Sequence, residues 1–156
     1  MRLDWLELKV PPLALLLGSA VAMYLVSEAF GRRTFASPAV AIAVGIAVAL
    51  VGLLLAFRGV IDFRRARTTV DPLHPERSAQ LVTAGIYRWT RNPMYLGFVV
   101  TLVGLAIALQ SPAGLVIASL ASAYLQRFQI RPEERILRRR FGDEFNAYRG
   151  QVRRWL

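Results

Sequence analysis

The sequence contains no cysteine and a single histidine among its 156 residues. The lack of cysteine excludes disulfides, thiolate metal sites and a cysteine nucleophile, and a lone histidine argues against a dedicated metal centre. Acidic residues are scarce, since 10 Asp and Glu stand against 20 Lys and Arg and the net charge is +10. Glycine-rich phosphate loops, nucleophile elbows and paired-histidine motifs are also missing, so a nucleotide-like cofactor is not expected to bind in the soluble Rossmann manner.

Apolar residues, in contrast, make up 55% of the chain, more than an ordinary soluble core of this size requires. Residues 10–29 and 37–57 form two apolar runs of roughly 20 residues, about the length that crosses a hydrocarbon core ~30 Å thick. Residues 95–109 and 113–125 form two shorter runs that meet at a Gln-Ser-Pro corner, which predicts a tight helical hairpin. We therefore expect an all-α integral membrane protein with about four transmembrane helices.

The basic residues are unevenly placed along the chain. Sixteen of the 20 lie in residues 58–91 and 127–154, and an excess of arginine beside spans marks the cytoplasmic side. Both termini are then cytoplasmic, and residues 30–36 form a short external loop. A basic surface also suits nucleic acid, but arginines that flank spans are the usual orientation signal and attract anionic headgroups. The lipid bilayer, and not nucleic acid, is the expected partner.

Several helix boundaries can be predicted from local signals. Ser37, Asn92 and Ser111 each precede a proline, which places a capping side chain before a residue suited to the first helical turn. Arg131-Pro132 is expected to open an amphipathic C-terminal helix that is interrupted near Gly142. Three further features are predicted. A helix leaves the membrane after residue 57, and residues 71–75 form a surface loop with a solvated His74. Glycine pairs allow close helix packing at Gly45 and Gly52 and at Gly97 and Gly104.

A polar and aromatic strip at residues 85–97 stands directly against the third apolar run. Polar groups near lipid are costly unless they have partners, and a helix start also offers free backbone amides to an anion. The predicted hairpin returns the strip and Glu133-Glu134 to one membrane face. The resulting pocket would hold Tyr87, Tyr95, Arg91, amides and two carboxylates, an inventory that suits a zwitterionic, sugar-bearing ligand.

Each part of this pocket has an alternative interpretation. Asn92 before Pro93 is equally consistent with simple capping, as at Ser37. The acidic pair would complement the helix dipole and pair with Arg131 or Arg138 even without a ligand, and tyrosines are common at membrane interfaces.

Three groups of residues carry a resemblance to a known family: the lead-in Leu81-Val82-Thr83-Ala84-Gly85-Ile86-Tyr87, the core Arg91-Asn92-Pro93-Met94-Tyr95, and Pro132-Glu133-Glu134 followed by Phe141-Gly142-Asp143-Glu144-Phe145 and Tyr148. The set resembles the isoprenylcysteine carboxyl methyltransferases, which are related to membrane phospholipid methyltransferases. The resemblance covers residues 68–156 and implies an integral membrane enzyme that uses S-adenosylmethionine. It further implies a lipophilic methyl acceptor that arrives from the bilayer and, because short bacterial relatives look similar, a bacterial inner membrane location.

Carried over by position, the resemblance implies cofactor contacts at these residues: the backbone of Gln80, Leu81 and Val82, together with Tyr87, Asn92, Pro93, Met94, Tyr95, Glu133 and the adjacent Glu134. The carboxylates are expected to hold ribose hydroxyls or the methionine ammonium. Residues 1–57 would supply two N-terminal spans and residues 58–156 the cofactor-binding part of a single domain. The sequence identifies no catalytic acid or base.

The sequence departs from eukaryotic members of this family at two positions. Asn92 stands where those proteins have histidine, and Gln129 stands where a substrate-contacting arginine is expected, so Gln129 and Arg131 are the candidate substrate-binding residues. A prenylated-protein substrate does not follow from the family name. Two rival hypotheses stay open at this point: a non-enzymatic lipid-binding or partner-docking membrane module, and a nicotinamide-dependent membrane reductase.

Overall fold

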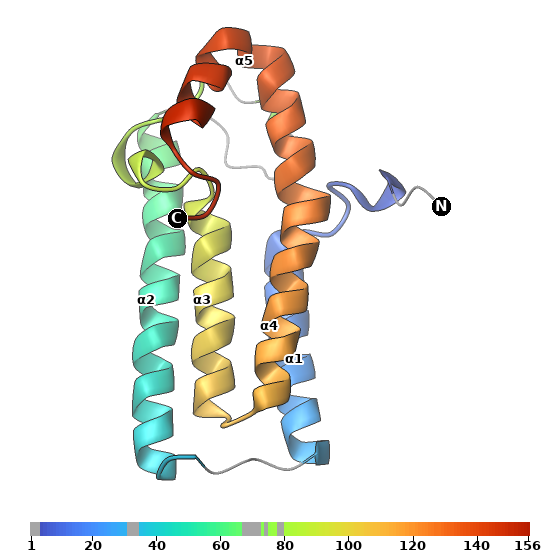
Figure 1. Ribbon diagram of the computed structural model, residues 1–156, viewed down its shortest axis with the longest axis vertical. Helices are drawn as coiled ribbons and strands as arrows, with labels where there is room; N and C mark the ends of the chain where they lie inside the picture. Colours follow the sequence, from blue (N-terminus) through green and yellow to red (C-terminus); the bar gives the residue numbers. More distant parts are fainter. Residues whose placement is uncertain (1–3, 31–34, 67–72, 74, 78–79) are drawn as a thin grey trace.

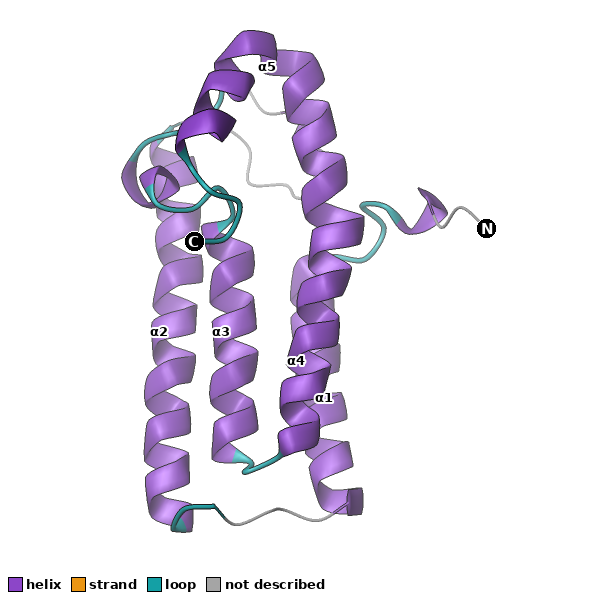
Figure 2. Cartoon of the chain, viewed as in Figure 1, coloured by secondary structure: helices purple, strands orange, loops and turns teal. Residues whose placement is uncertain are grey.

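The computed structural model describes residues 4–30, 35–66, 73, 75–77 and 80–156, and every regular element within them is helical (Figures 1 and 2). The long helices are α1 (Pro12–Phe30), α2 (Pro38–Arg65), α3 (Pro93–Ala108), α4 (Pro112–Leu125) and α5 (Arg131–Gln151). The short elements are η1 (Asp4–Leu6), η2 (Pro75–Arg77), η3 (Gly85–Arg88) and a π-helical turn, η4 (Gln126–Ile130). His74 and most of the predicted loop at 71–75 lie outside the described residues.

Helices α1 to α4 lie side by side as a bundle, and α5 continues from α4 and then bends over one end of it (Figure 1). Two of them, α1 and α2, are long and apolar enough to cross a membrane, while α3 is a shorter apolar helix. The apolar runs expected from the sequence correspond to these helices. Helix α2 extends past residue 57 without a break, which confirms the expected helical segment that begins there.

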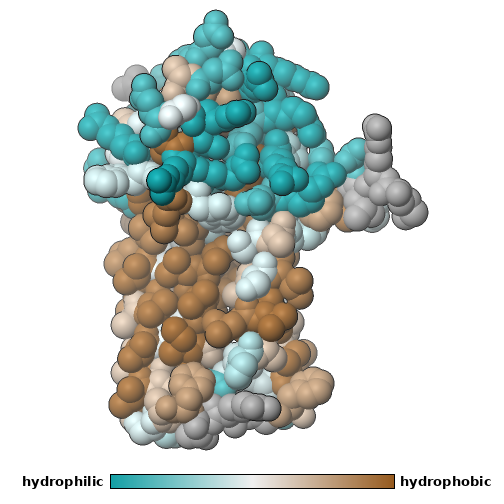
Figure 3. All heavy atoms as spheres, in the orientation of Figure 1, coloured by the Kyte–Doolittle hydropathy of each residue, from teal (hydrophilic) through white to brown (hydrophobic). Residues whose placement is uncertain are grey.

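The outside of the bundle is apolar along most of its length. Large side chains such as Leu54, Phe57 and Leu120 are 62–66% exposed. Figure 3 shows a hydrophobic band over the bundle and a hydrophilic end where α5 lies. Because exposed apolar area of this extent is unfavourable in water, the bundle surface suits lipid.

Helices α2 and α3 approach each other closely through glycines. A Cβ atom at Gly52 would lie 2.6 Å from the carbonyl oxygen of Gly97, and a Cβ at Gly45 would lie 2.6 Å from that of Gly104. Both distances are shorter than a carbon–oxygen contact allows. The predicted role of the paired glycines in close packing is therefore confirmed.

The expected hairpin between α3 and α4 is present. Gln110 turns the chain with a φ of 49°, and the Ser111 hydroxyl accepts a hydrogen bond from the N–H of Gly114 at 3.2 Å, which caps α4 as predicted. Ser37 caps α2 in the same way through the N–H of Val40.

The C-terminal helix begins at Arg131, as predicted, although no loop separates it from the element before it. Helix α4 passes through the π-helical turn η4 directly into α5. Pro132 lacks an N–H and cannot bond the carbonyl four residues earlier, at Phe128. That carbonyl instead accepts a hydrogen bond from the N–H of Leu8 at 2.9 Å. The proline is thus accommodated inside a continuous helix, because the N-terminal segment replaces the missing donor.

Helix α5 folds back at Gly142, whose φ of 51° and ψ of −119° are not helical, as the interruption predicted at this position requires. The returning half packs Phe145, Tyr148 and Val152 against Val82 and Tyr87 in one apolar cluster. This cluster fixes the loop before α3 against the end of the chain, which places the polar strip next to α5.

Candidate functional site

The candidate site lies where the start of α3 meets the start of α5. Tyr95 is only 4% exposed, and its hydroxyl donates a hydrogen bond to Oε1 of Glu133. The Tyr95 ring also packs with Leu125 and Ile130. Two segments that are 38 residues apart in the sequence are therefore joined by a direct side-chain contact. This confirms the expectation that the hairpin returns the strip and the acidic pair to one end of the bundle.

Glu133 titrates far from its ordinary range. Desolvation by the surrounding protein raises the pKa of its carboxyl from 4.5 to about 8, while the hydrogen bond from Tyr95 acts in the opposite direction and the negative charge of Glu134 adds to the rise. The carboxyl is therefore largely protonated at neutral pH. A cation placed beside it would favour the ionised form, so Glu133 suits a positively charged ligand.

Glu134 is held in the opposite state by two arginines. Its carboxylate accepts a hydrogen bond from Arg91 at 2.7 Å and from two nitrogens of Arg154 at 3.0 and 2.6 Å. Burial acts to raise the pKa of Glu134, but the guanidinium groups of Arg154 and Arg91 outweigh it and hold the pKa below its ordinary value. Glu134 thus pairs with Arg91 and Arg154, and not with Arg131 or Arg138 as in the alternative interpretation.

The polar strip is covered by the C-terminal tail, residues 152–156, which follows α5. The backbone N–H of Arg91 donates to the carbonyl of Arg153 at 3.0 Å. The Thr90 hydroxyl and the Asn92 amide donate to the carbonyl of Arg154 at 3.3 and 2.9 Å. The Asn92 side chain makes no capping bond to α3, so the predicted cap at this position is wrong. Its amide group binds the tail instead.

Pro93 and Met94 form the apolar side of the strip. Pro93 is fully buried in the first turn of α3. Met94 lies against α2, since a Cβ atom at Gly59 would come within 2.8 Å of its Cγ. The start of α3 is thereby fixed against α2 on one side and against the tail on the other.

The turn η3 presents Tyr87 and is held by a residue that the sequence analysis did not identify. Oδ2 of Asp62 accepts a hydrogen bond from the N–H of Ile86 at 2.9 Å. A Cβ atom at Gly85 would lie 2.1 Å from the same oxygen, and the φ of Gly85 is +62°, so only glycine fits there. The one sequence signal for Asp62 was that it is the sole acidic residue in α2.

Among the described residues, four buried polar atoms lack a hydrogen-bond partner: the Tyr87 hydroxyl, Nε of Arg91, the Tyr124 hydroxyl and Oε1 of Gln129. Burial raises the pKa of Tyr87, with smaller contributions from Tyr148 and Glu133, so its hydroxyl stays neutral. About 90% or more of buried polar groups in native proteins have partners. Two of these atoms, the Tyr87 hydroxyl and Nε of Arg91, belong to the strip, and they therefore fit a polar ligand there.

The segment before η3 lies along α2. The Gln80 side-chain amide donates to the carbonyl of Ala66 at 2.6 Å. Val82 is buried and Leu81 packs against the same cluster as Tyr87. The structure thus connects this segment to Tyr87 through packing, and it places Gln80 at the end of α2.

The two candidate substrate-binding residues lie on either side of the junction between η4 and α5. Gln129 is fully buried in η4, and its Nε2 donates to the carbonyl of Val10 at 2.6 Å. Arg131 is exposed at the start of α5. Their side chains face the N-terminal segment and the surface, respectively. In the part of the chain that the structure describes, no cluster of three or more His, Asp or Glu residues is arranged to hold a metal ion.

A sequence profile of the family described as phospholipid methyltransferase matches residues 40–144. This range includes the strip, the hairpin and the acidic pair.

Similar curated proteins carry a related name. The "Probable protein-S-isoprenylcysteine O-methyltransferase" of Oryza sativa subsp. indica is 32% identical over 109 residues, which cover 70% of this chain and 57% of the rice protein. The protein-S-isoprenylcysteine O-methyltransferase B of Arabidopsis thaliana is 27% identical over 108 residues, or 69% of this chain and 55% of that protein. A Saccharomyces cerevisiae protein of the same activity name is 36% identical over 72 residues, or 46% of this chain and 30% of its own length. The chain thus spans little more than half the length of the rice and Arabidopsis relatives.

Proposed function

Because the chain belongs to the phospholipid methyltransferase family, we propose that it is a membrane enzyme that transfers a methyl group from S-adenosylmethionine to a lipophilic acceptor. The observation that carries this proposal is the hydrogen bond between Tyr95 and Glu133. It joins two segments that both lie within the range matched by the family profile.

The chemistry of the site supports this cofactor. When bound, S-adenosylmethionine supplies an electrophilic methyl group on a positively charged sulfonium. Glu133 is positioned to compensate positive charge and gains ionised character beside it. The Tyr87 hydroxyl, buried without a partner, is available to a polar group of the cofactor. Pro93 and Met94 of the strip, together with the backbone of Gln80, Leu81 and Val82, complete the proposed contacts.

Arg91, Asn92 and Glu134 have a different part in this proposal. Apart from the unpaired Nε of Arg91, their side chains already bind the C-terminal tail or one another. They would therefore position the wall of the site, while Glu133 and Tyr95 contact the cofactor. A placed donor and a desolvated acceptor supply much of the rate enhancement of a transfer reaction without a dedicated base.

The acceptor is proposed to reach the site from the bilayer. Four spans, α1 to α4, would place the basic end and both termini in the cytoplasm, in keeping with the positive-inside rule, and the protein in a bacterial inner membrane. The protein would form a single domain, in which residues 1–57 contain two membrane spans and residues 58–156 contain the cofactor-binding part. Gln129 and Arg131 are the proposed acceptor contacts. The names of the similar plant and yeast proteins suggest a prenylated acceptor as one class to test.

Calorimetry on detergent-purified protein tests the cofactor proposal. We expect both S-adenosylmethionine and S-adenosylhomocysteine to bind. Glu133→Gln should lower the affinity for S-adenosylmethionine more than the affinity for S-adenosylhomocysteine, because only S-adenosylmethionine carries the positive charge of the sulfonium. Glu144→Gln is the matched control, since Glu144 is exposed on the same helix. Between pH 6 and 7.5 the wild-type affinity for S-adenosylmethionine should rise with pH, because Glu133 must lose its proton to pair with a cation.

The alternatives give different results. A non-enzymatic lipid-binding module would bind neither ligand at millimolar concentration, and a reductase would bind NADPH in competition with them. Incubation of membrane lipid extracts with methyl-labelled cofactor, followed by mass spectrometry, would identify the acceptor. Binding without any labelled lipid or lipidated peptide would contradict methyl transfer while leaving cofactor recognition intact.

A further inference from the structure

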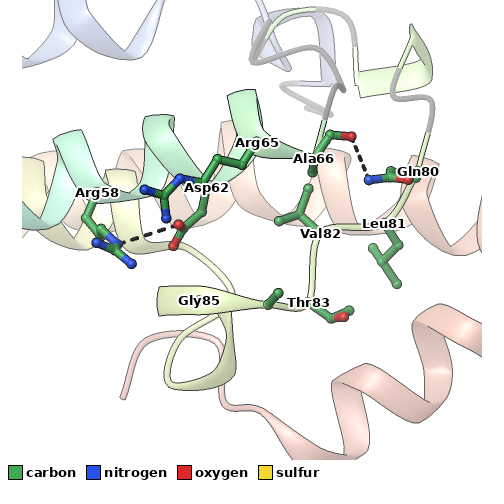
Figure 4. Close-up of a pocket in the computed structure, with 10 residues that line it drawn as sticks. Arg58, Asp62, Arg65, Ala66, Gln80, Leu81, Val82, Thr83 and Gly85 are labelled. Carbon is green, nitrogen blue, oxygen red and sulfur yellow. Dashed lines mark hydrogen bonds and ion pairs between the residues drawn. The ribbon is translucent and has the colours of Figure 1, made fainter.

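We propose that a second site, between the end of α2 and residues 80–85, binds the phosphate of an anionic membrane phospholipid. The site is a pocket of about 380 Å³. Figure 4 shows Arg58, Asp62 and Arg65 projecting from α2 on one side and the segment from Gln80 to Gly85 running along the other. This proposal does not depend on the methyl-transfer function.

The pocket lies at the depth where α2 would leave the hydrocarbon. A helix of 28 residues is about 42 Å long at ~1.5 Å per residue, whereas the hydrocarbon core is ~30 Å thick. The first 20 residues of α2, 38–57, are without charge and end at the exposed Phe57. Arg58 and Arg65 follow them, so both guanidinium groups are placed among lipid headgroups.

The charges in the pocket favour a monoanion. Arg58 and Arg65 contribute two positive charges and Asp62 one negative charge. The Asp62 carboxylate is already engaged, because it accepts the N–H of Ile86 at 2.9 Å and lies 3.5 Å from Nε of Arg58. The Arg58 side chain is 52% exposed, and Arg65 is exposed as well. Both arginines line the same pocket, and guanidinium groups recognise phosphate well.

The C-terminal end of α2 repels an anion, but less strongly than the side chains of the pocket attract it. The helix C-terminus carries a partial negative charge of about half a unit. The Gln80 amide donates to the carbonyl of Ala66 at this end, which satisfies one of the acceptors that would otherwise face the pocket. The net balance of one full positive charge from the side chains therefore dominates.

The net positive charge of this pocket also distinguishes it from the proposed cofactor site. S-adenosylmethionine carries a net positive charge, which two arginines would repel. The lining of the pocket includes neither Tyr95 nor Glu133. Leu81 and Val82 pack toward the cluster that contains Tyr87, so the segment 80–85 is the wall between the two sites. A bound phospholipid would hold this wall against α2.

Native mass spectrometry of the detergent-solubilised full chain tests the proposal with stepwise addition of phosphatidylglycerol. The comparison lipid is phosphatidylcholine, which carries the same phosphate but no net charge. We expect preferential retention of phosphatidylglycerol, and a loss of about fivefold in affinity for each arginine removed by Arg58→Ala and Arg65→Ala. The control is the pair Arg138→Ala and Arg139→Ala, which removes the same charge from exposed positions of α5.

Four outcomes decide the matter. Loss of phosphatidylglycerol selectivity in the α2 double variant, with the α5 double variant unchanged, supports the site. Equal loss of phosphatidylglycerol selectivity in both double variants would mean that only the overall charge of the protein matters. Equal retention of phosphatidylglycerol and phosphatidylcholine would mean that the site does not recognise the anionic headgroup. Either result overturns the proposal. Inorganic phosphate that binds as tightly as the lipid, and with the same dependence on Arg58 and Arg65, would overturn the lipid as the ligand. Arg58→Lys and Arg65→Lys should retain part of the binding, which separates lost recognition from misfolding.

Discussion

The fold holds the pKa of Glu133 at about 8, against an ordinary value of 4.5, and this has a consequence for stability. The folded protein keeps the Glu133 proton at a pH where the unfolded chain has lost it. Ionisation of Glu133 therefore lowers the free energy of unfolding progressively as the pH rises from about 4.5 to about 8, and the cost is constant above that range.

Glu133→Gln removes this titration, because the amide is neutral at every pH. We expect the melting temperature of the variant in detergent to exceed that of the wild type by several degrees at pH 8, and the difference to shrink toward pH 5. Differential scanning fluorimetry across that pH range provides the measurement. The exposed Glu144→Gln change should leave the profile of the wild type unaltered. A difference that does not vary with pH would show that Glu133 does not titrate as described.

Gly85 is the second residue whose identity is dictated locally. Its positive φ and the closeness of Asp62 mean that Gly85→Ala must strain the backbone and displace the carboxylate that holds η3. We expect a loss of about 2 kcal/mol or more in stability, together with weaker cofactor binding because Tyr87 shifts. Gly150→Ala is the control, since a Cβ atom there meets nothing within 4 Å. Equal melting temperatures of the two variants in detergent would contradict this account.

Residues differ in how far the sequence alone could assign them. Tyr95 and Glu133 were predicted to share a site, and they are in contact. Asp62 was missed because nothing local shows that a residue on α2 bonds the amide of Ile86, 24 positions later. Asn92 was predicted as a cap because its position before a proline matches Ser37 and Ser111. The competing acceptor, the carbonyl of Arg154, belongs to a distant part of the chain.

At the scale of helices, prolines and glycines carried most of the information. The apolar helix starts at Pro38, Pro93 and Pro112 lie within two residues of the predicted boundaries. The continuity of α4 and α5 was not predictable, because the Phe128 carbonyl that Pro132 leaves without a donor is satisfied by the distant N–H of Leu8. Local sequence at Arg131-Pro132 is equally compatible with a new helix and with a continuous one.

The packing of α2 on α3 gives a prediction at this scale. A Cβ atom at Gly97 would lie 2.4 Å from the carbonyl oxygen of Gly52 and 2.6 Å from the backbone nitrogen of Ala56. Backbone atoms cannot move aside as a side chain can, so Gly97→Ala must separate the two helices. We expect a loss of about 1 to 3 kcal/mol in stability, seen as a lower melting temperature in detergent.

Gly18→Ala in α1 is the matched control for Gly97→Ala. A Cβ atom at Gly18 has no neighbour within 4 Å, and alanine has the higher helix propensity. The control should therefore be neutral or slightly stabilising. A similar effect of both changes would mean that α2 and α3 are not in the close contact described.

At the scale of the whole molecule, the described residues near both ends of the chain converge on η4 and the start of α5. The N-terminal segment binds this region through ion pairs from Glu7 to Arg127 and to Arg135, and from Asp4 to Arg127. The C-terminal tail binds it through Arg154 and Glu134. The first turn of α5, which carries Glu133, is thus held from two sides. This arrangement of termini follows from tertiary contacts and could not be predicted from the charge pattern, which indicated only that both ends lie on the basic side.

The tail gives the corresponding prediction. Arg154→Ala removes both of its hydrogen bonds to Glu134, whereas Arg91 still pairs with that carboxylate. Because the Arg154 side chain is one-third exposed, solvent screens the ion pair and we expect it to contribute about 1 kcal/mol. Hydrogen–deuterium exchange should show roughly fivefold faster exchange of the Arg91 amide, which donates to the tail, with a smaller effect at high salt. Arg153→Ala removes the same charge from an exposed neighbour and should leave exchange unchanged. If it accelerated exchange equally, the tail would be held by its backbone bonds and by general charge, and not by the ion pair between Arg154 and Glu134.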